Sequence, residues 1–399
     1  MNVLFLTHRL PYAPNRGDRA RAFHLLKILQ AHAKVALVSL VHDDEEQAHQ
    51  NELAGLATSV HTARIPRLRN LIRSALALPT ARPTTHTMLD APALEAAIDT
   101  AVETARPDVV LAYCSGMARL ALGPRLRAFP MVLDMVDVDS AKWSDLGDVS
   151  RPPLSWVYRR EARTLRAFER SATLHARTTM VVTEREAQTL REIAPSGRVD
   201  VVPNGVDVRG YRPTTPPADS ADVIFCGVMN YAPNERAAVL LAREVWPLVR
   251  RSAPTARLML VGSQPSSLVQ SLASDASGIV VTGAVPDVRP YLWSSAVAAA
   301  PLWTARGIQN KVLEAVAAGL PTVVTPNILS SLPDEVARAC RVGDDAPSLA
   351  RAITDLLALS PEARRAQASG VDLGRLTWEH QLSAVPGIVA EAASGGPRR

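Results

Sequence analysis

Short apolar segments recur along the chain and alternate with stretches in which apolar residues return at helical spacing. In the first half, the apolar segments predict β-strands at 2–7, 35–41, 108–113, 131–136, 179–183 and 199–203. In the second half, they predict strands at 222–226, 257–262, 278–282 and 296–301. Strands that alternate with helices in this way form parallel sheets covered by helices on both faces. The pattern therefore predicts an α/β protein built from doubly wound parallel sheets.

A Pro- and Ser-containing stretch at 213–222 interrupts this alternation, which then starts again. A chain of 399 residues is also too long for one ordinary hydrophobic core. Two domains are therefore expected. We place the first domain at 1–210, the linker at 211–221, the second domain at 222–375 and a terminal helical segment at 376–394.

The segment Ala300–Thr325 carries the clearest candidate for a ligand site. A strand end is followed by a loop around Gly307, by a helix that begins near Gln309 or Asn310, and then by a glycine stop and a second strand. Unpaired backbone N–H groups in such a loop, together with the positive end of the helix dipole, suit a phosphate. Glu314, a turn or so into the helix, can accept hydrogen bonds from sugar hydroxyls. Phosphate and hydroxyl recognition together predict a nucleotide pocket.

The first strand leads into a second loop that contains a glycine. Residues 8–17 join this strand to a helix that Asp18 can cap, and Gly17 ends the loop. The segment lacks the Gly-x-Gly-x-x-Gly fingerprint of dinucleotide-binding proteins. It is interpreted either as a rigid connection between strand and helix or as part of the wall of a cleft.

Three carboxylates lie at the carboxyl end of the predicted strand 131–136. They are Asp134, Asp137 and Asp139, and ligands bind at this edge of open α/β sheets. Such a cluster could hold a divalent metal, supply one general base, or cap the helix that begins near Ser140. The base and the cap are the interpretations we favour over the metal.

Two charged segments of the first half have different patterns. In Arg64–Leu78, arginines and leucines alternate at spacings that predict a basic amphipathic helix. Such a helix can lie on an anionic bilayer, or it can be a surface helix with snorkelling arginines. In Arg151–Arg177, arginines and the acids Glu161 and Glu169 predict a long helix whose charged face is solvated.

Composition narrows the class of protein. Hydrophobic residues make up 47% of the chain and charged residues 21%, which is typical of a soluble globular enzyme. A net charge of +5 favours anionic ligands or a membrane surface, but aromatic residues are too scarce for base stacking, so no nucleic-acid partner is expected.

Cysteine usage and the absence of long apolar runs bear on location. The three scattered cysteines argue against a disulfide framework and favour a reducing cytosol. The first strand is too short for a signal peptide, and no run approaches the roughly 18 apolar residues of a membrane span. We expect a cytoplasmic protein, at most peripheral on the membrane.

These motifs together resemble the family-four glycosyltransferases, which have the GT-B fold of two Rossmann-like domains facing a central cleft. The resemblance covers nearly the whole chain. It rests on the 8–17 loop with Pro11, Pro14 and Gly17, the turn Asn204–Asp207, the start Phe225–Gly227 with Pro233 and Asn234, and the segment Lys311–Val324. More narrowly, Asp137–Trp143 and Arg306–Glu314 look like sugar transferases associated with exopolysaccharide and exosortase-type gene clusters.

The resemblance implies transfer of a sugar from a nucleotide diphosphate donor, a UDP- or GDP-sugar, with retention at the anomeric carbon and without a further cofactor or metal. It places the donor on the second domain, the saccharide or lipid-linked acceptor on the first, and the terminal helix back against the first domain. Glu314 matches the glutamate that binds the ribose. The donor phosphates and base are matched by Gly17, Gly227, Val285, Gly307, Ile308, Gln309 and Asn310.

This sequence departs from the family pattern in two places. Arg306 stands where the family has a glutamate that holds the donor sugar, and the Arg/Lys pair that follows Gly227 in the family is missing. One hypothesis is that Arg306, with Lys311 or Arg289, replaces the lost diphosphate clamp. The other is that Arg306 binds the carboxylate of a uronic-acid donor.

The family often has a histidine near the reacting carbon, and Asp137 occupies the most similar place in this chain. We therefore predict Asp137 as an acceptor-side base or orienting group. Three alternative functions stay open: a GT-B transferase with a small natural-product acceptor, a nucleotide-sugar epimerase, and a degenerate homologue that binds nucleotide without turnover.

Overall fold

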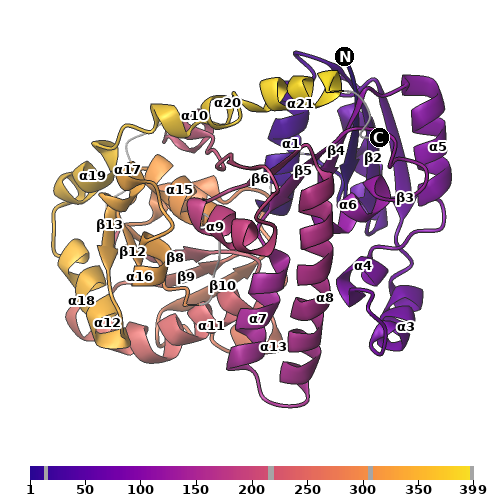
Figure 1. Ribbon diagram of the computed structural model, residues 1–399. Helices are drawn as coiled ribbons and strands as arrows, with labels where there is room; N and C mark the ends of the chain where they lie inside the picture. Colours follow the sequence, from indigo (N-terminus) through magenta and orange to yellow (C-terminus); the bar gives the residue numbers. More distant parts are fainter. Residues whose placement is uncertain (13–16, 214–219, 304–308, 396–399) are drawn as a thin grey trace. The chain divides into compact units, whose positions relative to one another are not determined.

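The computed structural model describes residues 1–12, 17–213, 220–303 and 309–395 (Figure 1). Its contacts divide the chain into two compact units. Unit 1 comprises Met1–Asn204 together with Gln381–Arg399, and unit 2 comprises Gly205–His380. The end of the chain therefore belongs to the same unit as its beginning.

The described residues of unit 1 form a seven-stranded parallel sheet in the order β3-β2-β1-β4-β5-β6-β7 (Figure 1). Val3, Leu4, Phe5 and Leu6 of the first strand are all fully buried, because helices cover both faces of a sheet of this kind. The strands are β1 (Asn2–Thr7), β2 (Lys34–Val41), β3 (Ser59–Arg64), β4 (Val109–Tyr113), β5 (Met131–Val136), β6 (Thr178–Val181) and β7 (Val199–Val201).

The helices of unit 1 pack on this sheet and on one another. Helix α5 contacts β1, β2 and β3, whereas the C-terminal helix α21 lies against α1 and contacts β4 and β5. The helices are α1 (Gly17–Leu29), α2 (Asp44–Ala48), the 3₁₀ turn η1 (His49–Leu53), α3 (Arg67–Ala77), α4 (Thr84–Met88), α5 (Leu94–Ala105), α6 (Ser115–Ala121), α7 (Asp139–Val149), α8 (Leu154–His175), α9 (Glu184–Ile193) and α21 (Val385–Ser394).

Unit 2 contains a six-stranded parallel sheet in the order β10-β9-β8-β11-β12-β13 within its described residues. Its apolar core packs the sheet residues Phe225 and Leu260 against Trp246 and Ile353 of the surrounding helices. The strands are β8 (Val223–Cys226), β9 (Leu258–Val261), β10 (Ile279–Gly283), β11 (Val297–Ala300), β12 (Thr322–Val324) and β13 (Cys340–Val342).

Many of the helices of unit 2 are short. The helical segment after the Gly227 loop consists of α11 and α12, joined by a π-helical turn. The elements are α10 (Val208–Tyr211), α11 (Ala232–Leu240), η2 (Leu241–Val245), α12 (Trp246–Ser252), α13 (Ser267–Gln270), α14 (Arg289–Ser294), α15 (Asn310–Ala317), α16 (Pro326–Leu329), α17 (Asp334–Ala337), α18 (Ala346–Leu357), α19 (Pro361–Ser369), η3 (Gly374–Leu376) and α20 (Trp378–Gln381).

The predicted fold class is confirmed, since both sheets are parallel and alternate with helices. Two edge strands, β3 and β13, were not predicted from the sequence. Strand β3 contains only two apolar residues, which are not adjacent, and it is mostly half-buried, so it has no apolar run that marks it. Strand β13 is three residues long and mostly exposed.

The prediction of a solvated charged face on the long helix is wrong for two of its acids. In α8, Glu161 is 1% exposed and Glu169 is fully buried. The backbone and hydroxyl groups of Thr84 and Thr85 donate to Glu161, and those of Ser140 donate to Glu169. Buried carboxylates are tolerated when they are fully hydrogen-bonded in this way.

Candidate active site

The helix that follows the 300–308 segment places Lys311 inside unit 2. Its ammonium group lies 2.5 Å from the Oδ1 of Asn234 and 5.0 Å from the centroid of the Phe225 ring. Burial lowers the pKa of Lys311 to about 8, although Cys226 and Glu314 act in the opposite direction. Because this pKa is still above neutrality, the group is mainly cationic at pH 7 and is well suited to an anionic ligand.

Asn234 connects Lys311 to the loop after β8. Its side-chain amide donates to the carbonyl of Val228 at 2.9 Å, and its backbone N–H donates to the carbonyl of Tyr231 at 2.8 Å. A Cβ atom at position 227 would lie 2.7 Å from the Asn234 amide nitrogen, so only glycine fits there. Gly227 and Asn234 together hold the loop that precedes α11.

Glu314 lies one turn further along α15 and is hydrogen-bonded to Tyr211 of α10. Burial raises the pKa of Glu314, whereas the Tyr211 hydrogen bond and the Lys311 charge lower it. Burial and the neighbouring Glu314 both raise the pKa of Tyr211, which keeps the phenol protonated and able to donate. Tyr211 has no motif around it in the sequence, and sequence reasoning missed it.

Arg289 is occupied by Asp287 and by the backbone of α10. Its guanidinium forms a bidentate pair with Asp287, with distances of 2.9 Å from Nε to both carboxylate oxygens, and its Nη1 donates to the carbonyl of Gly210. Val285 packs beside the small core around Leu292. Of the two predicted alternatives to the lost basic pair, Lys311 is the one that contacts the Gly227–Asn234 loop.

Several predicted residues lie at or beyond the limits of the described segments. Arg306, Gly307 and Ile308 fall outside the described residues. Gln309 is the N-cap of α15 in an extended conformation, and Asn310 is its first residue. In unit 1, Gly17 is the first residue of α1.

In unit 1, strained backbone marks the carboxyl edge of two neighbouring strands. Val136 at the end of β5 has φ 66°, and Cys114 directly after β4 has φ 70° and ψ 165°. A β-branched residue with positive φ is a genuine outlier, and the Cys114 conformation is one that glycine almost alone adopts. Such strain clusters at functional sites. Here it turns the chain immediately before Asp137 and Ser115.

Asp137 follows this turn with one carboxyl oxygen, Oδ1, that is buried and has no hydrogen-bond partner among the described residues. Burial, together with the charges of Glu186 and Asp139, raises its pKa to about 7, while Lys142 acts in the opposite direction. Glu186 of α9 is fully buried and accepts the backbone N–H of Val138 at 2.6 Å. Asp137 is therefore a carboxyl group that exchanges a proton near neutral pH.

The other two carboxylates of the predicted cluster have structural partners. Asp134 is buried and pairs with the Nε of Arg21 at 2.8 Å. The Nη1 of Arg21 also donates a hydrogen bond to the Oδ1 of Asn204 at 3.1 Å. Asp139 is the first residue of α7, and its carboxylate accepts a hydrogen bond from the hydroxyl of Ser115 at 2.9 Å. Within the described residues, no group of acids, histidines or cysteines is arranged to hold a metal ion.

Comparison with known proteins gives this arrangement a context. Residues 16–205 match the family model of the glycosyl transferase 4-like domain, and residues 220–359 match that of glycosyl transferases group 1. The chain is a glycosyltransferase of the GT-B type. Among curated proteins no match was found.

Solved glycosyltransferase structures have the same fold as this GT-B enzyme over its full length. Sucrose-phosphate synthase from Thermosynechococcus elongatus has a TM-score of 0.69 at 16% identity, covering 99% of this chain and 100% of its own. Anabaena HepE in complex with UDP and glucose has a TM-score of 0.66 at 13% identity, covering 98% and 100%. WaaG, a glycosyltransferase involved in lipopolysaccharide biosynthesis, has a TM-score of 0.63 at 16% identity, covering 99% and 100%.

Proposed function

We propose that this enzyme transfers a sugar from a UDP- or GDP-sugar, with retention of anomeric configuration, to a saccharide or lipid-linked acceptor in the synthesis of a cell-surface polysaccharide. The observation that carries the proposal is the pairing, on one face of α15, of a half-buried cation, Lys311, with a half-buried acid, Glu314. Lys311 suits the diphosphate, and Glu314 with Tyr211 suits the ribose hydroxyls. Solved GT-B structures with UDP and with UDP-glucose support a nucleotide-sugar donor.

The donor phosphates are the leaving group, so their stabilisation governs the rate. The bond between the anomeric carbon and the diphosphate oxygen breaks while the acceptor oxygen bonds to the same face of that carbon. A diphosphate oxygen then takes the acceptor proton. We infer that Lys311 stabilises the developing charge, and that Arg306 adds a second cation in place of the missing basic pair.

On the acceptor side, we infer that Asp137 accepts a hydrogen bond from the reacting hydroxyl. Within the described residues its Oδ1 has no hydrogen-bond partner, and its pKa of about 7 keeps a large fraction ionised at neutral pH. A lipid-linked acceptor would bring the enzyme to the cytoplasmic face of the membrane. We therefore propose a cytoplasmic protein that binds this membrane peripherally.

A thermal-shift comparison of UDP, GDP and ADP tests the donor assignment. A nucleotide present at about 100 times its Kd stabilises the folded protein by about 2.7 kcal/mol, which gives a shift of several degrees. We expect UDP or GDP, and not ADP, to produce this shift. If none of the three does, the nucleotide site is wrong.

The same preparation then separates an enzyme from a binder. Release of the nucleotide diphosphate from the preferred donor, without added acceptor, demonstrates turnover. Binding without release supports the degenerate homologue. The coupling constants of the anomeric proton in a transferred product decide between retention and inversion, and an inverted product would overturn the retaining mechanism.

A further inference from the structure

Helix α3 of unit 1 has its polar and apolar faces reversed relative to a typical surface helix. Asn70, Ser74 and Ala77 face the protein and are buried. The opposite face carries large apolar side chains that are mostly exposed: Leu68 75%, Leu71 60%, Ile72 58% and Leu76 70%. At 100° per residue, these four side chains span an arc centred directly opposite the buried face. An apolar stripe of this kind marks an interaction site.

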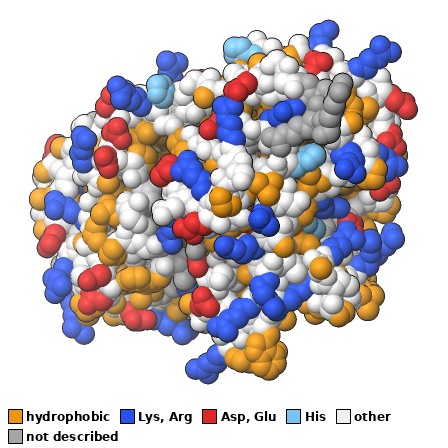
Figure 2. Space-filling view, viewed as in Figure 1, with side chains coloured by type: hydrophobic (Ala, Val, Ile, Leu, Met, Phe, Trp, Pro, Cys, Tyr) orange, Lys and Arg blue, Asp and Glu red, His pale blue; other side chains and the backbone are white. Residues whose placement is uncertain are grey.

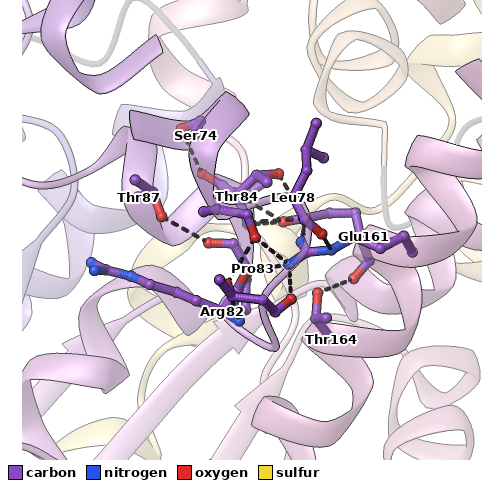
Figure 3. Close-up of polar contacts among 12 residues, drawn as sticks. Ser74, Leu78, Arg82, Pro83, Thr84, Thr87, Glu161 and Thr164 are labelled. Carbon is purple, nitrogen blue, oxygen red and sulfur yellow. Dashed lines mark hydrogen bonds and ion pairs between the residues drawn. The ribbon is translucent and has the colours of Figure 1, made fainter. Parts of the chain in front are cut away.

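Polar contacts fix α3 in this orientation. The Asn70 side-chain amide donates to the carbonyls of Met88 and Asp90 at 3.1 and 2.7 Å. Figure 3 shows the Ser74 hydroxyl, which donates to the carbonyl of Thr84 at 3.3 Å. Because these bonds require the polar face to point inward, the leucines have to point outward.

Two residues of α8 clamp the segment that follows α3. The guanidinium of Arg160 donates to the carbonyls of Ala77 and Leu78, both at 3.0 Å, and to those of residues 80 and 82. Glu161 accepts from Thr84 and Thr85 at the start of α4 (Figure 3). The apolar stripe is therefore presented by a rigid support.

A basic pocket of about 310 Å³ lies along the flank of α3. Asp90 forms ion pairs with Arg73, Arg82 and Arg119 at 3.2, 2.8 and 3.0 Å. The wall also contains Arg69 and Glu95, so four guanidinium groups face two carboxylates. The Nε of Arg119 is buried without a hydrogen-bond partner in the described part of the chain. This excess of positive charge and donors suits a phosphate group.

Apolar and basic side chains also extend to the start of α8. Leu154 is 55% exposed and Trp156 is 66% exposed, and Arg159, three residues after Trp156, pairs with Asp148 at 3.4 Å. Figure 2 shows hydrophobic side chains beside Lys and Arg side chains over α3 and over the adjoining ends of α7 and α8. Trp prefers the interface between lipid and water. No helix in the described segments is long and apolar enough to cross a membrane.

We propose that α3, the arginine pocket beside it and Trp156 form a docking surface for an anionic phospholipid bilayer. The leucine stripe enters the boundary between headgroups and acyl chains, and the arginine pocket binds a lipid phosphate. The alternation of apolar and basic groups gives the charge complementarity that such a bilayer requires and that a second copy of this positively charged chain lacks. This surface rests on the peripheral membrane binding proposed above and names the residues for it; none of these residues belongs to the proposed donor site.

Flotation of the full chain with two kinds of vesicle tests the proposal. One kind is phosphatidylcholine alone, and the other contains 30% phosphatidylglycerol in phosphatidylcholine. We expect binding to the anionic vesicles only. The variant Leu71→Ser/Leu76→Ser should lose at least about tenfold in binding. The variant Arg69→Gln/Arg73→Gln should lose about 20- to 30-fold, since each basic residue near the surface contributes about fivefold.

The matched control is Arg236→Gln/Arg251→Gln, which removes the same charge from exposed positions of unit 2 and should bind as wild type does. All the substituted leucines are exposed in the wild type, so the folded state should be retained. The proposal is overturned if wild type does not float, if it floats equally well with neutral vesicles, or if both α3 variants float like wild type. Sedimentation equilibrium that shows a dimer abolished by Leu71→Ser/Leu76→Ser would assign the stripe to a second copy instead.

Discussion

The ammonium group of Lys311 lies 2.5 Å from the side-chain oxygen of Asn234, and this contact joins α15 to the first turn of α11. The two residues are far apart in sequence but both belong to segments that the family resemblance assigns to the donor. Lys311 thereby contributes a positive charge next to Gly227, where the family's Arg/Lys pair is absent. Arg289, the other candidate, is already neutralised by Asp287.

We predict that Lys311→Met weakens donor binding by about 10- to 100-fold, because a hydrogen bond to a charged group contributes roughly 1.5–3 kcal/mol. The affinity for UDP or GDP, measured by calorimetry, checks this. The control is Lys34→Met at an exposed position of unit 1, which should leave the affinity unchanged. Unchanged affinity in Lys311→Met would remove Lys311 from the diphosphate site.

Tyr211→Phe should make donor binding dependent on pH. The Tyr211 hydrogen bond lowers the pKa of Glu314, and without it burial raises that pKa further. Glu314 in the variant therefore takes up a proton at a higher pH than in the wild type and loses its acceptor capacity for ribose hydroxyls. We expect near wild-type Kd at pH 8 and a progressively weaker Kd than wild type as pH falls toward 5.5. A ratio of the two Kd values that is constant with pH contradicts this role.

Asp137→Asn tests the acceptor side through two readouts. If ionised Asp137 assists the acceptor hydroxyl, wild-type kcat/KM rises with pH through about 7, and the variant loses about 10²- to 10⁴-fold together with that limb. Stability should change in the opposite sense. Because the pKa of Asp137 is raised on folding, the folded protein binds the extra proton and loses stability as pH rises from about 4 to about 7.

The neutral Asn avoids that loss. Asp137→Asn should therefore unfold at higher temperature than wild type at pH 8, by ~2–4 kcal/mol of unfolding free energy, and show little difference at pH 4. If the variant is fully active and no more stable than wild type at pH 8, Asp137 does not assist the acceptor hydroxyl and its pKa is not raised on folding.

Most strands of the two sheets could be predicted from the sequence, because a parallel strand that is buried on both faces consists of consecutive apolar residues. Glu314 and Lys311 could be placed on a helix after a glycine loop for the same local reason. Tyr211 could not, since its contact with Glu314 depends on how α10 packs, and no local pattern marks it. The periodicity of the sequence also predicted that α3 is amphipathic, but it did not predict which face of the helix points to solvent. Which face points outward is decided by Asn70 and Ser74, whose acceptors lie 10 to 20 residues away.

The sequence pattern predicts that Glu161 is solvated, but in the structure this carboxylate is buried and holds α4 through hydrogen bonds. It accepts four hydrogen bonds from Thr84 and Thr85, at 2.7 to 2.9 Å. Burial by itself would raise the pKa of Glu161, but these hydrogen bonds together outweigh burial and hold the pKa below its usual value. We predict that Glu161→Gln lowers the free energy of unfolding by about 2–4 kcal/mol at pH 7, because an amide cannot accept on both sides.

The pH dependence distinguishes this role from simple loss of packing. A carboxyl whose pKa is lowered on folding stabilises the protein above its unfolded pKa, and that stabilisation is lost as pH falls through the folded pKa. The difference between wild type and Glu161→Gln in urea unfolding should therefore be full at pH 7 and shrink below about pH 4. Glu362→Gln, an exposed acid on α19, should change stability far less than Glu161→Gln does. A difference that persists unchanged at pH 3 would mean that Glu161 acts through its shape and not through its charge.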